Sequence, residues 1–203
     1  MSSFILALIL LLPFQQQTIA KIGGESVSPT PPKEGIVDQS FLEPTNSGGN
    51  INERYSHVGQ TYIAGITGRL TGVNIDVISK RSLNPGQSYQ KAKLSVALYT
   101  IEDLENSIPG ILLGEVTVDD ESPLSNLITF PEPIEQIKGK KYAIVVHYVD
   151  APAPGVNQWL GQWYGSKGNI GGERIVGDGT IWKVSETKYT SHFRTYVAPR
   201  NEH

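Results

Sequence analysis

The sequence predicts an all-β protein, a two-sheet antiparallel β-sandwich that is jelly-roll-like. Short segments rich in β-branched and aromatic residues recur between turns that contain Gly, Pro, Asn or Asp, and no long segment shows helical periodicity. Residues 138–149 (KGKKYAIVVHYV) form the longest strongly β-forming run after the N-terminus. Tyr142 and Ile144 fall on one face of this strand, and Ala143 and Val145 on the other. Both faces therefore need cover, which only other strands can supply here.

The composition is that of a globular, turn-rich chain with one core. Of the 203 residues, 38% are hydrophobic and 18% are charged, and 21 Gly and 13 Pro supply turns. A net charge of −3 offers no electrostatic footprint for nucleic acid, so we expect no nucleic-acid partner. The absence of cysteine excludes disulfides, thiolate metal sites and a thiol nucleophile.

The N-terminal residues are typical of a secretory signal peptide. Residues 4–14 form an apolar run too short to span a membrane, and Thr18-Ile19-Ala20 places small residues at the positions that a signal peptidase reads, although residues 1–3 lack a Lys or Arg. We expect residues 1–20 to be a signal peptide. The mature protein is then secreted, extracellular or on the cell surface, with no membrane span. Residues 21–35, rich in Pro, Thr and Ser, are expected to be a linker or tail.

The first half of the domain predicts strands with one polar face. We expect strands over residues 36–42, 58–64, 69–79 and 93–100. The last two alternate, with inward side chains at Leu70, Val73, Ile75, Val77, Leu94, Val96 and Leu98. Their other residues are expected on a solvated outer face, among them Asn74, Asp76, Ser95, Ala97 and Tyr99.

The second half predicts shorter strands. Residues 101–107 are compatible with a single helical turn, residues 111–118 with a strand, and residues 124–130 with a short strand that Pro131 and Pro133 stop. After the central strand, further strands are expected over residues 157–165, 173–177, 179–184 and 191–198. A single domain thus spans residues 36–198, and residues 199–203 form a C-terminal tail.

Six segments carry a resemblance to a known group of proteins: residues 60–62, 68–73, 94–99, 139–145, 178–182 and 193–197. Their order and spacing resemble a β-sandwich module of secreted and cell-surface bacterial proteins, a poorly characterised family that is carbohydrate-binding-module-like. The resemblance implies a jelly-roll-like sandwich outside the cell with a non-catalytic accessory role, and it implies no active-site residues. The long connection at residues 80–90 and the single glycine after Asp178 depart from the family, so ligand sites on loops are the least transferable part.

An aromatic group in the C-terminal half is the best candidate for a ligand site. Flat aromatic rings stack on the C–H faces of sugar rings, and side-chain amides bond to hydroxyl groups. The candidate ligand-binding residues are Asn157, Trp159, Gln162, Trp163, Tyr164 and Trp182. Trp159 and Trp163 are four apart in one predicted strand and so share a face. Burial of both between the sheets is the other interpretation, and Gln162 and Tyr164 would then be the exposed pair.

Motifs for other chemistry are missing. The acidic runs at residues 102–105 and 119–121 have no EF-hand-like spacing, so we expect no cofactor, although a structural calcium ion at a strand end is left open. The chain contains no GxSxG or HExxH motif, and its four histidines have no ligand-like spacing. No catalytic residue is therefore assigned.

Three hypotheses for the function remain. The first is a secreted non-catalytic module that binds an extracellular glycan or a surface protein. The second is a structural subunit of an extracellular filament or coat, which self-associates when residues 36–42 of one copy add as a strand to the open sheet edge of another. The third is a glycoside hydrolase with a pair of carboxylates, whose geometry a sequence does not show.

Overall fold

The computed structural model describes most of the predicted domain. The described residues are 35–42, 47–52, 55–82, 93–118, 127–149, 159–168, 172–187 and 189–200, and only the backbone is described at 47–50, 52, 78–82, 159 and 160. The predicted signal peptide, nearly all of the linker and the last three residues of the tail lie outside this part of the chain. The described residues contain no helix long and apolar enough to cross a membrane.

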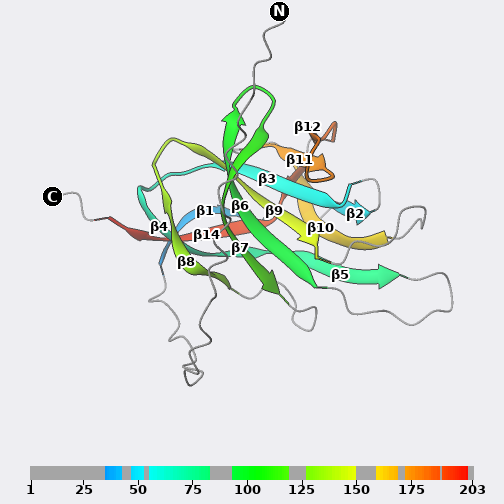
Figure 1. Cartoon of the computed structure of the whole chain (residues 1–203), viewed down its shortest axis with the longest axis horizontal. Helices are drawn as coiled ribbons and strands as arrows, with labels where there is room; N and C mark the ends of the chain where they lie inside the picture. Colours follow the sequence, from blue (N-terminus) through cyan, green and yellow to red (C-terminus); the bar gives the residue numbers. More distant parts are fainter. Residues whose placement is uncertain are drawn as a thin grey trace, which may run out of the picture. The chain divides into compact units, whose positions relative to one another are not determined.

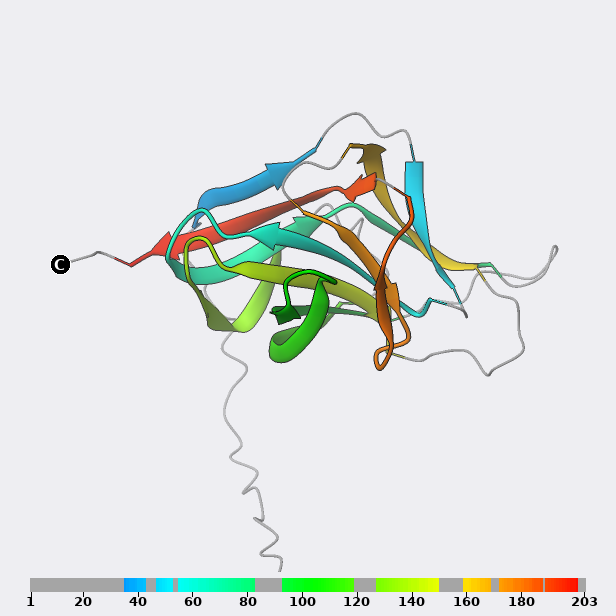
Figure 2. The ribbon, with the colours of Figure 1, turned by 90° about the horizontal axis from the view of Figure 1, so that it is seen from above.

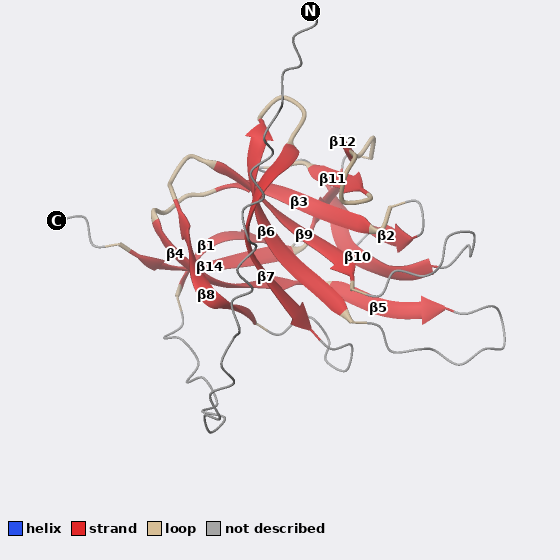
Figure 3. Ribbon diagram, in the orientation of Figure 1, coloured by secondary structure: helices blue, strands red, loops and turns tan. Residues whose placement is uncertain are grey.

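The described residues form fourteen β-strands and no helix, which confirms the all-β prediction (Figures 1 and 3). The strands are β1 (Ile36–Phe41), β2 (Ser47–Asn52), β3 (His57–Ile63), β4 (Gly68–Ile75), β5 (Val77–Ser82), β6 (Leu94–Asp103), β7 (Ile108–Val118), β8 (Ile128–Gln136), β9 (Lys141–Tyr148), β10 (Trp159–Lys167), β11 (Arg174–Gly177), β12 (Trp182–Val184), β13 (Tyr189–Ser191) and β14 (Phe193–Pro199). All of their pairings are antiparallel.

One layer of the sandwich is a six-stranded sheet in the order β12-β11-β3-β9-β6-β7. The predicted central strand is β9, which pairs with β3 on one side and β6 on the other. Every residue from Tyr142 to Val146 is buried, so both faces of β9 are covered as its sequence requires.

The other layer is divided into two groups of strands that meet at a junction. One group has the order β1-β14-β4-β8, and in the other β10 pairs with β2 along one edge and with β5 and then β13 along the opposite edge. Three backbone hydrogen bonds form a ring at the junction: Asp76 N–H to His192 O (3.4 Å), His192 N–H to Tyr164 O (2.8 Å) and Tyr164 N–H to Asp76 O (2.8 Å). Asp76 joins β4 to β5 and His192 joins β13 to β14, so the ring fixes β10 across the ends of the β4–β14 pair.

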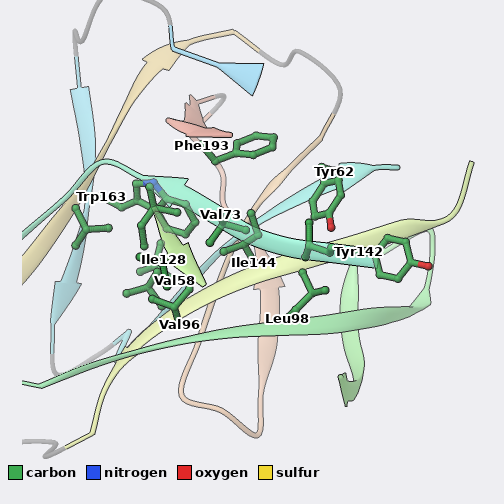
Figure 4. Close-up of a cluster of buried hydrophobic side chains, with 14 of the residues drawn as sticks. Val58, Tyr62, Val73, Val96, Leu98, Ile128, Tyr142, Ile144, Trp163 and Phe193 are labelled. Carbon is green, nitrogen blue, oxygen red and sulfur yellow. The ribbon is translucent and has the colours of Figure 1, made fainter. Parts of the chain in front are cut away.

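The main hydrophobic core lies between the two layers (Figure 4). It contains the inward side chains that alternation predicts in the segments that form β4, β5 and β6, and all seven are buried at 4% exposure or less. Trp163 is the largest fully buried side chain among the described residues, and its indole Nε1–H donates to His192 O at 2.8 Å. Burial of each large apolar side chain stabilises the fold by about 1.5–3 kcal/mol, so this core is the main source of stability.

The prediction that the outer face of β6 is exposed to solvent is wrong, because Ser95 and Ala97 are buried at 1% and 0% exposure. The pairing of β6 with β7 shifts three times between Leu98 and Asp103, and the hairpin curls (Figure 2, green) until β7 and β12, the two edges of the sheet, come into contact. Tyr99 and Trp182 consequently approach to 6.5 Å between ring centroids, although three strands separate β6 from β12. They pack with a second, smaller core formed by Ala143, Val145 and Ile175.

Two local predictions are also wrong. The prolines at 131 and 133 do not stop their strand, because β8 is an edge strand and its pairing with β4 skips from Thr129 to Ile134 at this point. An edge position with a pairing irregularity tolerates residues that lack a backbone N–H. The expected helical turn at residues 101–107 is instead the end of β6 followed by a tight turn.

The segment proposed as a donor strand fills an edge of its own sheet. β1 pairs with β14 of the same chain. Its Asp38 carboxylate accepts hydrogen bonds from Gly65 N–H (3.0 Å) and Gln136 Nε2 (2.8 Å), and the N–H of Gln39 donates to Thr195 Oγ1 (2.9 Å). Transfer of this segment to a neighbouring molecule would first have to break these bonds.

Candidate functional site

Of the six residues that the sequence nominates for a ligand site, the structure describes the side chains of four: Gln162, Trp163, Tyr164 and Trp182. Trp163 is fully buried, so core packing, the second interpretation of the two tryptophans, describes it. Trp159 belongs to β10, whose pairing shifts between Trp159 and Gly161, and only its backbone is described. Asn157 lies outside the described residues.

Of the remaining three, two stay together. Gln162 and Tyr164 alternate with the buried Trp163 in β10, and both are half-buried. Trp182 is also half-buried, but it lies in β12, at an edge of the other layer. Among the described side chains, Gln162 and Tyr164 therefore belong to one layer and Trp182 to the other.

A hollow of about 260 Å³ opens beside the β11–β12 hairpin. We call it the Tyr55 hollow. Its lining residues are Tyr55, Val176, Gly177, Asp178, Ile181 and Lys183. Val176 and Ile181 supply apolar walls, and Ile181 is 74% exposed, the highest value among the large hydrophobic residues described.

The turn that contains Asp178 is held by several hydrogen bonds within the turn. Asp178 Oδ1 accepts hydrogen bonds from Thr180 N–H, Ile181 N–H and the Thr180 hydroxyl, each at 2.8 Å. These bonds favour the ionised carboxylate and lower the pKa of Asp178 to about 2. Gly179 has a φ of +97°, a conformation that side-chain-bearing residues rarely adopt, so the glycine suits this turn.

The lining of the hollow also includes a cation close to an aromatic ring. Lys183 Nζ lies 5.3 Å from the centroid of the Tyr55 ring, which is within cation–π distance. The Trp182 ring lies close to this region, because a Cβ atom added at Gly177 would meet two of its ring carbons at 3.0 Å. The hollow thus combines an aromatic face, an ammonium group, a carboxylate and apolar walls.

A pair of histidines lies beside the same turn. His57 and His147 are directly opposite each other on β3 and β9, and their rings stack with centroids 4.4 Å apart. His147 Nε2 is 3.5 Å from Glu115 Oε1, and the His57 ring meets the edge of Trp182 at 5.7 Å. Burial, followed by the neighbouring His147, lowers the pKa of His57 to about 4, and burial also lowers the pKa of His147.

A second polar cluster has the connectivity of a catalytic triad. His192 Nδ1 is 3.2 Å from Asp76 Oδ2, and His192 Nε2 is 3.0 Å from Ser166 Oγ. In a triad the serine meets the substrate and the acid is buried, whereas here Ser166 is only 3% exposed and the Asp76 side chain is 43% exposed. The cluster lies at the junction of the divided layer, so we assign it a structural role there.

A third cluster fixes the curled hairpin. Lys141 Nζ donates to Glu173 Oε2 at 2.8 Å and to Ser107 Oγ at 2.6 Å, and Ser107 Oγ also bonds to Glu173. The bonds from Lys141 and Ser107 lower the pKa of Glu173, so the ion pair is charged at neutral pH. Ser107, at the tip of the β6–β7 hairpin, has a φ of +54°, and these bonds hold it in that conformation.

The comparisons with known proteins give no assignment: no family model, no curated protein and no solved structure matches the chain. Within the part of the chain that the structure describes, no group of three or more His, Asp or Glu side chains is placed to hold a metal ion.

Sequence reasoning missed Tyr55 and Lys183, which lie more than 120 residues apart in the chain. The turn at Asp178-Gly179 and the neighbouring Trp182 were the local signals for this region.

Proposed function

We propose that the protein is a secreted, non-catalytic binding module that binds a glycan in the Tyr55 hollow. The observation that carries the proposal is the combination in one open hollow of the Tyr55 ring, the Lys183 ammonium group and the Asp178 carboxylate. The expected signal peptide supports an extracellular ligand, because it would bring the domain to the outside of the cell.

The chemistry of the hollow suits a sugar. An aromatic ring with apolar neighbours such as Val176 and Ile181 packs against the C–H face of a sugar ring, and charged groups at the rim bond to its hydroxyl groups. A volume of about 260 Å³ is just below the usual range of ligand pockets, roughly 300–1,000 Å³. We therefore propose that one or two sugar units of a longer chain enter the hollow and the rest stays in solvent.

The lining of the hollow is also ordered in the absence of a ligand. The three hydrogen bonds of Asp178 and the positive φ of Gly179 fix the turn. Lys183 belongs to β12, which pairs with β11. A site that is already ordered loses less conformational entropy on binding, which raises the affinity that a small contact area can reach.

The experiment that tests the proposal is a glycan array probed with the labelled mature protein, followed by titration calorimetry with the best glycan. We expect Tyr55→Ala to weaken binding about tenfold, because loss of one aromatic stacking contact costs about 1.4 kcal/mol at most. Lys183→Met should weaken it as well, because it removes a charged hydrogen-bond donor.

Tyr164→Ala is the matched control, since Tyr164 is another half-buried tyrosine and belongs to the site that the sequence nominates. We expect this variant to bind like the wild type. Loss of binding in Tyr164→Ala with normal binding in Tyr55→Ala would move the site to β10. The absence of any glycan signal would reject glycan binding altogether.

A further inference from the structure

Arg174 is a buried charged side chain without a partner. It lies in β11 and is 3% exposed. Its Nη2 atom makes no hydrogen bond, and none of the ion pairs among the described residues involves it. Burial alone lowers the pKa of Arg174 to about 10, so the guanidinium group is still charged at neutral pH.

This arrangement is costly in an otherwise well-paired domain. A buried ionised group without a compensating charge or hydrogen bond destabilises a protein by several kcal/mol, and buried charges are nearly always paired. The partly buried ion pair described above follows this rule, since Lys141 bonds to Glu173. Arg174 therefore needs a counter-charge from outside the described side chains.

The surroundings of Arg174 offer further donors to such a counter-charge. Arg174 pairs directly with Gln60 of β3, so the two side chains lie on the same face of the sheet. Gln60 is fully buried, and its Oε1 accepts a hydrogen bond from Ser191 N–H at 2.8 Å. The Ser191 hydroxyl is also buried and also has no hydrogen-bond partner. Two unpaired donors, a guanidinium group and a hydroxyl group, thus occur where β11 and β13 are in contact.

We propose that Arg174 and Ser191 form a binding site for a small anion of the size of chloride or formate. The planar guanidinium group donates charge-assisted hydrogen bonds, and the Ser191 hydroxyl donates another. We expect the anion to be small because both donors are buried, with Arg174 3% and Ser191 0% exposed. The proposal is independent of the Tyr55 hollow, whose lining does not include either residue.

The test is the thermal unfolding of the full mature chain in increasing concentrations of sodium chloride or formate. Sodium gluconate, whose anion is too large for the site, keeps the ionic strength constant. A ligand that binds only the folded state stabilises it in proportion to the logarithm of its concentration above the Kd. For a domain of this size we expect the midpoint to rise by about 3 to 6 °C for each tenfold increase in the anion.

Two variants separate this site from general salt effects. Arg174→Met removes the charge but retains the long side chain, and it should abolish the anion-dependent rise. Arg69→Met removes an arginine whose side chain is 64% exposed, and it should retain the rise. If wild type and Arg174→Met respond equally to chloride and formate, the proposal is wrong.

A crystal structure of the wild type in sodium bromide provides the second readout, which does not depend on the variants folding. We expect an anomalous bromide peak within hydrogen-bond distance of Arg174 Nη2 and Ser191 Oγ. Water or empty space there at high bromide concentration would overturn the proposal.

Discussion

The stacked pair of His57 and His147 makes the stability of this protein sensitive to moderate acid. The pKa of His57 is lowered from 6.5 to about 4 in the folded state. Between these two values the unfolded chain binds more protons than the folded chain, so the free energy of unfolding rises with pH. The stability is therefore fully present above pH 6.5, and it decreases as the pH falls toward 4.

The size of the loss follows from the same numbers. The full difference between 6.5 and about 4 corresponds to ~3 kcal/mol at 1.36 kcal/mol per pH unit. The ring is half-buried, so solvent screening reduces this to about 1–2 kcal/mol. The groups that face it act in both directions, since His147 lowers the pKa of His57 whereas Asp178 and Glu115 raise it.

Urea unfolding at a series of pH values between 7 and 4.5 measures this effect. His57→Phe keeps a flat ring against Trp182 and His147 but cannot take a proton, so we expect its stability to fall by about 1–2 kcal/mol less than that of the wild type over this range. The difference between the two proteins cancels the contribution of the carboxyl groups that they share. Parallel stability curves for wild type and His57→Phe would refute the reasoning.

Two further predictions concern packing and backbone conformation. Trp163→Ala should destabilise the protein by about 3–5 kcal/mol, because it removes a large, fully buried side chain from the core, whereas Tyr164→Ala should cost less than about 1 kcal/mol. Urea unfolding followed by circular dichroism measures both losses. Equal losses for the two variants would contradict the assignment of Trp163 to the core. Gly139→Ala should lower the free energy of unfolding by about 1 kcal/mol, because φ is +82° although the added Cβ atom meets nothing within 4 Å. Gly172→Ala should cost several times more, because its Cβ atom would lie 1.8 Å from Thr61 O. Similar losses for the two glycines would show that the close approach at Gly172 is absent in solution.

The sequence by itself determined the fold class and the central strand. Alternation of apolar and polar residues in β4 and β6, and the doubly apolar β9, depend on the two-residue period of a strand, which is a local property. The inward side chains of these strands, such as Leu70 and Val96, are accordingly buried. The same local reasoning left two interpretations open for Trp163, a ligand site or core packing, and its burial agrees with core packing.

Tertiary structure decided which faces are covered and which residues meet. Ser95 and Ala97 follow the pattern of a wet face, but the curled β6–β7 hairpin brings Tyr99 and Trp182 over that face, and no local pattern predicts such a curl. Tyr55 and Lys183 meet only because antiparallel pairing places β12 beside β11, and β11 beside β3. Sequence periodicity predicts which face of each strand is buried. A surface site, in contrast, depends on long-range strand pairing, which brings together residues that are far apart in the sequence.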